Sequence, residues 1–283
     1  MRRSSRWVLG LALTLTASAR AGAQSWAFAP DGAVRIVNPA GRVRVIGWDA
    51  DSLSASPSGA SVAGDTHVKK LVVSSPKGDS VDLEVHVPRR ASVWVKSTTA
   101  AIDVEGMDGT LDLNSVGGPI HVVGTPADVT AETMSGSVEI AGGTERARVK
   151  TVSGDILLRG ASVDLGASTL SGTITVRAAG WQRGGTGVQR GKFESVTGPV
   201  RFDGEVGRSG ILDLESQSGP IALRVPGTTI ADFDLLTIGG SIRNGLTTQA
   251  PKGGELKFSM GAAGAGAQVT VRSFKGTISL DAK

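Results

Sequence analysis

Hydrophobic and polar residues along the chain repeat with a period of eighteen residues from Val93 onward. Each unit has apolar residues at its positions 1 and 3 and again at positions 10 and 12. Two short runs with a period of two predict two β-strands, because successive side chains of a strand point to opposite faces. The step is clearest at position 10. The residues there are Ile102, Ile120, Val138, Ile156 and Ile174.

Polar and small residues separate the two predicted strands of each unit. Position 5 always carries a hydroxyl, at Ser97, Ser115, Thr133, Thr151 and Thr169. Position 8 carries Ala100 and then Gly118, Gly136, Gly154 and Gly172. We expect the hydroxyls to bond nearby backbone and the glycines to use their freedom to adopt positive φ. A second turn is predicted at the glycines of position 14, which are Gly106, Gly124, Gly142 and Gly160.

A chain that turns twice in eighteen residues and then repeats itself is predicted to wind into coils. One coil would bury four or five aliphatic side chains, worth about 10 kcal/mol, whereas ordering its backbone costs roughly 18–36 kcal/mol. A single coil therefore needs neighbours that cover it and share backbone hydrogen bonds with it. The predicted fold class is all-β, a parallel β-solenoid or β-helix in which residues eighteen apart stack about 4.8 Å from one another.

Two structural regions are expected in this fold. The solenoid is predicted to span residues 93–283, and its spacing becomes looser after a glycine-rich loop at residues 178–192. Residues 24–92 lack the eighteen-residue step but keep strand-like runs at residues 33–37 and 42–46. We therefore predict that residues 24–92 form an N-terminal β cap over the first coil.

Residues 1–23 have the layout of a cleavable signal peptide. Arginines precede an apolar run from Trp7 to about Ala19, which is too short to span a bilayer, and Ala21-Gly22-Ala23 resembles a cleavage site. We expect an exported protein of the periplasm or the cell surface, without an integral membrane span. Cysteine is absent, so neither disulfides nor a lipid-modified N-terminal cysteine is expected, and the protein is not predicted to be a lipoprotein.

Charge argues against a nucleic-acid partner. Four of the 30 basic residues lie in the predicted signal peptide, which leaves 26 basic residues against 26 acidic ones. Proteins that bind nucleic acids use a basic excess to neutralise phosphate groups. With no cysteine thiolate and only three histidines, neither a metal site nor a cofactor is predicted.

Several short motifs follow one another along nearly all of residues 24–283. They are Val43-Arg44-Val45-Ile46-Gly47-Trp48-Asp49, Val85-His86-Val87-Pro88, the serial Ser-Gly-x-Ile-x-Val turns and Val271-Arg272-Ser273-Phe274-Lys275-Gly276-Thr277-Ile278. In this order they resemble the putative adhesin family of bacterial β-strand-repeat proteins, a family of largely unknown function with auto-transporter-adhesin-like members. The resemblance implies an exported, β-helix-like fold and a role in the cell envelope. It supplies no catalytic residues.

One outward series of charged residues could support chemistry. Asp103, His121 and Glu139 occupy position 11 of successive units, so they are predicted to lie in one row about 4.8 Å apart. Two carboxylates around a histidine could perform general acid–base catalysis or hold a cation. The alternative is that outward positions alternate in charge to stay soluble, and the continuation of the row as Leu157 and Thr175 favours this alternative.

Exposed aromatic and aliphatic residues are the other candidates for a binding surface. Trp94 at an outward position, Trp181 in the glycine-rich loop and Trp48 at a strand end could each stack on a sugar or cover an edge of the core. An apolar series follows the hydroxyl series by one residue, at Val116, Met134, Val152, Leu170 and Val196. We expect this series to close the core at the turn, although an exposed stripe would mark a partner surface.

The leading hypothesis is a non-enzymatic, adhesin-like binding or structural protein of the cell envelope, with a glycan or an envelope protein as its partner. The rival hypothesis is a polysaccharide-active β-helix enzyme centred on Asp103, His121 and Glu139. A third possibility is a purely structural partner within an envelope complex. Because no residue set is typical of an enzyme, no catalytic, cofactor-binding or metal-binding residue is assigned.

Overall fold

A computed structural model describes residues 24–56, 60–73, 79–178, 187–262, 264 and 266–283. The predicted signal peptide and residues 179–186 of the predicted glycine-rich loop lie outside the described residues. Throughout the described part the chain forms strands and turns, and none of it is a helix that could cross a membrane. The predicted all-β class is confirmed.

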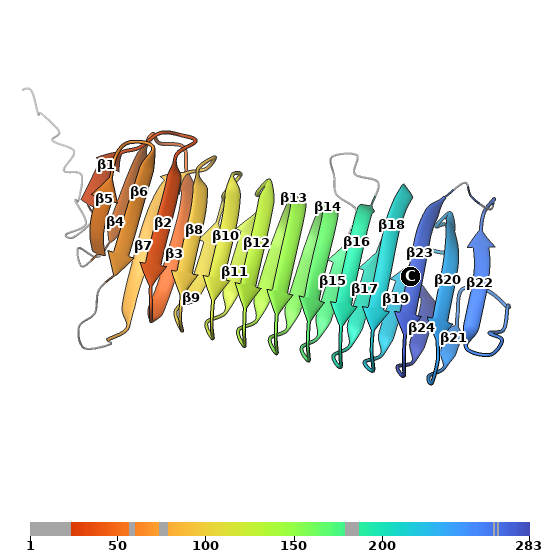
Figure 1. The fold of residues 1–283 in the computed structure, drawn as a ribbon. Helices are drawn as coiled ribbons and strands as arrows, with labels where there is room; N and C mark the ends of the chain where they lie inside the picture. The colour runs from red at the N-terminus through yellow and green to blue at the C-terminus, as the bar shows by residue number, and fades with distance from the viewer. Residues whose placement is uncertain (1–23, 57–59, 74–78, 179–186, 263, 265) are drawn as a thin grey trace, which may run out of the picture.

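The strands form a long stack with two hydrogen-bonded rows, which we name the first and second ladders (Figure 1). In spatial order the first ladder contains β5 (Ala60–Gly64), β6 (Val68–Val73), β2 (Ala33–Asn38), β8 (Ser92–Ser97), β10 (Thr110–Ser115), β12 (Asp128–Thr133), the second halves of β13 (Val138–Thr151) and β14 (Ile156–Thr169), β16 (Val188–Ser195), β18 (Val206–Ser216), β23 (Ala267–Ser273), β20 (Ala231–Thr237) and β22 (Glu255–Met260).

The second ladder faces the first. It contains β1 (Gln24–Ala27), β4 (Ser52–Ser56), β7 (Val81–Pro88), β3 (Gly41–Trp48), β9 (Ala101–Glu105), β11 (Ile120–Gly124), the first halves of β13 and β14, β15 (Ile174–Ala178), β17 (Val200–Gly204), β19 (Ile221–Val225), β24 (Ile278–Ala282) and β21 (Ile242–Asn244). Pairing is parallel within both ladders except at their ends, where β1, β4, β5 and β22 pair in the antiparallel sense.

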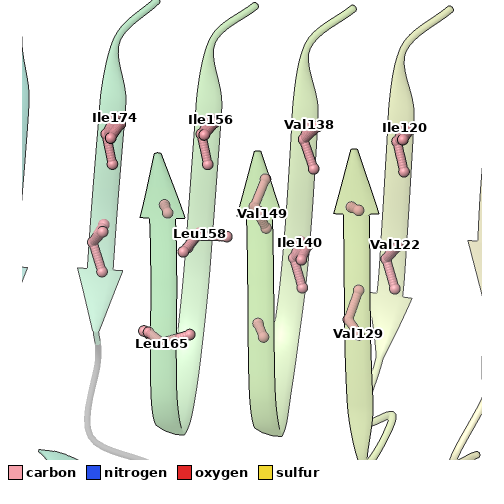
Figure 2. Close-up of a cluster of buried hydrophobic side chains, with 14 of the residues drawn as sticks. Ile120, Val122, Val129, Val138, Ile140, Val149, Ile156, Leu158, Leu165 and Ile174 are labelled. Carbon is pink, nitrogen blue, oxygen red and sulfur yellow. The ribbon is translucent and has the colours of Figure 1, made fainter. Parts of the chain in front are cut away.

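Residues eighteen apart are paired as the repeat predicts. Ile120 is in register with Ile102 on one side and with Val138 on the other. The same row continues through Ile156 to Ile174. All five side chains point away from solvent, and Figure 2 shows four of them in one line. The parallel register therefore converts the sequence period into continuous rows of like residues.

The hydrophobic core is the space between the two ladders. Strands in the middle of the stack, such as β10, β12 and β15, alternate buried and more exposed residues. Inward residues of the first ladder, such as Val129, Val149 and Leu165, face inward residues of the second ladder, such as Val122 and Ile140 (Figure 2). Few charged residues lie between the two ladders. Burial of this aliphatic layer therefore supplies the main stabilising free energy of the stack.

The position-5 hydroxyls form a buried polar row beside this core. Thr133 Oγ1 accepts a hydrogen bond from Gly136 N at 3.0 Å, and Thr169 Oγ1 accepts one from Gly172 N at 3.0 Å. Thr151 Oγ1 instead donates to the Gly154 carbonyl at 2.9 Å. The expected bonding of these hydroxyls to nearby backbone is confirmed at these turns. The hydroxyls replace the strand hydrogen bonds that are lost where the chain turns.

The two glycine series serve different purposes. The position-14 glycines have positive φ, with values of 67° at Gly106 and 128° at Gly142. The expectation of positive φ at position 8 is wrong, because no described glycine of that series has it. A Cβ at Gly118 would instead stand 2.0 Å from the Ala100 carbonyl oxygen, and one at Gly154 would stand 1.9 Å from the Gly136 carbonyl oxygen. Close approach of stacked turns excludes larger residues here.

Two pairs of strands are inserted within the stack and not added to it in chain order, namely β2 with β3 and β23 with β24. The pair β2 and β3 stands between β6 and β7 on one side and β8 and β9 on the other. At the other end, β23 and β24 stand between β18 and β19 and the pair β20 and β21. Strands on the two sides of residue 92 thus pair directly, and the predicted division into a cap and a solenoid stays a prediction.

Adjacent glycines of one turn provide a test of the close stacking. Gly118→Ala is expected to lower the free energy of unfolding by about 1–3 kcal/mol, because its new Cβ would overlap the Ala100 carbonyl oxygen. Gly117→Ala is the matched control. Its Cβ would meet nothing nearer than 3.6 Å, so the free energy should stay the same or rise by about 0.4–1 kcal/mol. Urea unfolding of both variants is the measurement, and equal effects would contradict the stacked-turn geometry.

Candidate functional site

Asp103, His121 and Glu139 lie side by side on the outer face of the second ladder. His121 on β11 is in register with Asp103 on β9 and with Glu139 on β13. Its Nδ1 atom is 3.9 Å from Oδ1 of Asp103. The eighteen-residue step thus brings the three residues together. Whether they bind anything stays a prediction.

Each carboxylate of this row has an arginine partner. Arg42 Nε lies 3.4 Å from Asp103 Oδ2, and Arg159 Nη2 lies 3.4 Å from Glu139 Oε1. All of these side chains are partly exposed, and exposed ion pairs of this kind add little stability. Among the residues that the structure describes, no group of three or more His, Asp and Glu side chains could hold a metal ion. The row is therefore a charged surface and lacks the geometry of a metal centre.

Two of the three candidate tryptophans, Trp94 and Trp48, lie in the described part of the structure. Trp94 is a partly buried, outward residue of β8. Trp48 at the end of β3 donates its Nε1 hydrogen to the Ser52 carbonyl at 2.8 Å and packs on His86 with ring centroids 5.1 Å apart. Trp48 is thus held by its own neighbours, as expected of a residue that covers a core edge. Trp181 lies outside the described residues.

A groove crosses the outer face of the first ladder at β14, and the sequence analysis did not anticipate it. Its volume is about 370 Å³, and we name it the β14 groove. The side chains that line it include Arg148, Lys150, Asp164, Gly166, Ser168, Arg190, Lys192, Glu194, Ile211 and Asp213. The volume falls in the range of pockets that bind small ligands.

Two small outward residues open the β14 groove. Gly166 is in register with Arg148 on β13 and with Lys192 on β16. Ser168, two residues further along β14, is flanked in the same way by Lys150 and Glu194. A strand with short side chains between two strands with long ones leaves a trough on the outer face of the sheet. The groove is a product of register, because these neighbours are 18 and 26 residues apart in the sequence.

The charges in the β14 groove are fixed by ion pairs. Arg148 Nη2 donates to Asp164 Oδ1 at 2.8 Å, and Arg190 Nε lies 3.8 Å from the other oxygen of Asp164. Lys192 Nζ lies 2.7 Å from Glu194 Oε1. That hydrogen bond raises the pKa of Lys192 above its usual value. The groove therefore holds cations and carboxylates in fixed positions, each with hydrogen-bonding capacity left over.

This combination suits a ligand rich in hydroxyl or carboxylate groups. Arginine and lysine donate hydrogen bonds, carboxylates accept them, and the Ser168 hydroxyl does both. The aliphatic stems of the long side chains and the partly exposed Ile211 supply apolar contact. Oligosaccharides present both hydroxyl groups and apolar C–H surfaces.

The apolar series beside the hydroxyl row is exposed, and the expectation that it closes the core is wrong. Exposed fractions reach 57% at Met134 and 71% at Ile238. Backbone hydrogen bonds connect successive turns, from Met134 N to Val116 O and from Leu170 N to Val152 O, so the residues form a line along one edge. In stacking order this apolar stripe contains Val116, Met134, Val152, Leu170, the half-buried Val196, Phe274 and Ile238, with Gln217 between Val196 and Phe274.

Comparison with known proteins identifies no family for this chain. No family model matches, and no curated protein matches. Among solved structures, the chain is similar to a putative adhesin from Bacteroides fragilis, with 12% identity, a TM-score of 0.47 and coverage of 91% of this chain and 95% of the other. It is also similar to a putative cell adhesion protein from Clostridium sporogenes, with 8% identity, a TM-score of 0.26 and coverage of 92% and 99%. Similarity at this level does not establish a shared fold or function.

Proposed function

We propose that the chain is a non-enzymatic, exported, adhesin-like protein of the cell envelope that binds carbohydrate in the β14 groove. In this proposal the two ladders are the walls of a parallel β-solenoid, and each unit from Val93 onward is one coil. Export rests on the signal-peptide layout of residues 1–23. The adhesin-like role rests on the resemblance of the motif order and on the groove.

The β14 groove is the observation that carries this proposal. Its floor and walls lie on strands whose backbone is hydrogen-bonded on both sides, so its shape is already present before a ligand arrives. Binding then orders few groups, which keeps the entropic cost low. Four cations around three carboxylates give a slight preference for sugars that carry an acidic group.

Filling the groove tests the proposal directly. Gly166→Ile places a branched side chain on the groove floor, where its Cβ would stand 2.9 Å from Cδ of Arg148, a flexible side chain that can shift. We expect it to weaken binding of the purified chain to its best ligand at least about tenfold, and to keep or raise stability, because glycine disfavours strands. An array of neutral and uronic-acid oligosaccharides identifies the ligand, and calorimetry measures the affinity.

A matched variant controls for surface changes. Thr175→Ile adds a similar side chain at an outward position of β15 in the other ladder and should leave binding unchanged. If the chain binds no oligosaccharide on the array, or if Gly166→Ile binds as tightly as the parent chain, the proposed ligand site is wrong.

A polysaccharide-active enzyme is the second candidate, because His121 and Asp103 lie 3.9 Å apart on one face. The proposal predicts that the chain releases no reducing ends or unsaturated products from the polysaccharides that it binds. Glu139→Gln removes one carboxylate of the row and breaks its pair with Arg159, and it should leave glycan binding unchanged. Cleavage by the parent chain that is lost in Glu139→Gln would replace binding with catalysis as the function.

A further inference from the structure

The apolar stripe is bordered on one side by polar groups that already have partners. Ser135 Oγ donates to the Val116 carbonyl at 3.5 Å, Ser153 Oγ donates to the Met134 carbonyl at 3.4 Å, and Thr197 Oγ1 donates to the Leu170 carbonyl at 3.2 Å. Covering such hydroxyls with another surface costs little, because their hydrogen bonds to the chain persist. The stripe and this border are therefore a surface that is easily desolvated.

A row of mostly polar and charged residues borders the stripe on its other side. These residues occupy position 4 of successive coils, at the outward ends of first-ladder strands, and we name them the rim row. In stacking order they are Lys96, Asn114, Glu132, Lys150, Ser168, Glu194, Glu215, Arg272 and Leu236. Because they are in register with one another, their charges lie at regular steps of about 4.8 Å along the stack.

The rim row is complementary to itself when two copies lie antiparallel. A two-fold axis between the coils of Leu170 and Val196 sets Lys150 opposite the partner's Glu215. It also sets Glu132 opposite the partner's Arg272. A shift by one coil in one direction places Glu132 against the partner's Glu215, which offsets the new contact of Lys150 with the partner's Glu194. A shift in the other direction places Lys150 against the partner's Arg272, and like charges in contact oppose association. The charges therefore favour one register over its neighbours.

The same alignment pairs most apolar residues of the stripe with one another, and only Val152 lies opposite a polar residue, the partner's Gln217. Leu170 lies opposite the partner's Val196, and Val116 lies opposite the partner's Ile238. An axis between Met134 and Val152 would also avoid like charges, but it would leave Ile238, the most exposed of these residues, uncovered. Seven coil steps give a contact about 34 Å long.

We propose that the apolar stripe is the interface of a homodimer in which a second copy of this chain docks antiparallel, with the two-fold axis between the coils of Leu170 and Val196. Proteins that remain monomeric rarely expose a large apolar patch, and only Gln217 interrupts this one. The rim-row residues Lys150, Ser168 and Glu194 also line the β14 groove, so the dimer would border one side of that groove. The inference does not rest on carbohydrate binding.

Disruption of the stripe tests whether the dimer exists. Analytical ultracentrifugation of the full chain over 1–200 μM is expected to show a monomer–dimer equilibrium. Leu170→Glu, next to the axis, should raise the dissociation constant at least 100-fold without a change in Tm. Val163→Glu is the control. Val163 in β14 is an exposed aliphatic residue like Leu170, with 51% exposure, but it lies off the stripe. A monomer at every concentration, or a dimer that Leu170→Glu leaves intact, would overturn the proposal.

A charge exchange tests the register. Lys150→Glu and Glu215→Lys should each weaken the dimer, because each sets like charges against each other across the axis. The double variant should restore the affinity to within a few fold of the parent chain. Within one chain the two residues are three coil steps apart, about 14 Å, so rescue has to come from the partner. A double variant that dimerises no better than either single variant would overturn the antiparallel pairing.

Discussion

The structure depends on the hydrogen-bonded register between successive repeat units, which sets each residue of one unit beside the equivalent residue of the next. Ile120 stands between Ile102 and Val138 because the backbone of β11 bonds to β9 and β13 without a shift. A slip of one residue would turn every inward side chain outward. The turns must therefore stack as tightly as the strands do, and glycines such as Gly118 make this possible because they have no Cβ.

Register also determines what the surface can do. A property of one unit position becomes a row along the stack, so the exposed apolar stripe and the polar rim row each follow from a single position of an eighteen-residue unit. A residue that differs in size from the rest of its row changes the shape of the surface at that point. Gly166, placed between Arg148 and Lys192, opens the β14 groove. Candidate binding surfaces on this protein thus come from the pattern of outward residues, while the inward residues hold the backbone in place.

Much of the fold could be predicted from the sequence, because its period fixes which residues are neighbours. The strand pairs, the buried hydroxyl row and the adjacency of Asp103 and His121 all follow from steps of eighteen. The position of β2 and β3 next to β8 and β9 could not be predicted in this way. Val34 pairs with Val93, and the residues between them follow no repeat that would indicate this pairing. The order of β20 and β23 is hidden for the same reason.

The candidate site was less predictable. The β14 groove forms because Gly166 pairs with Lys192 across an interruption of the repeat. The length of that interruption does not by itself show which residues pair. Exposure of the apolar stripe depends on which way one residue of a turn points, which periodicity does not determine. A signal was present, however, because the stripe residues directly follow the hydroxyl row. A side chain adjacent to a buried one points outward wherever the chain stays extended.

Distances between spin labels along one outward row test the central claim, the stacking of equivalent residues, most directly. The chain has no cysteine, so paired cysteine variants at Asn114 and Ser168, and at Asn114 and Glu215, can be labelled without background and diluted with unlabelled chain. Stacking predicts separations of about 14 Å over three coil steps and about 24 Å over five. Separations that do not grow in proportion to the number of steps, or a second distance beyond about 40 Å, would contradict it.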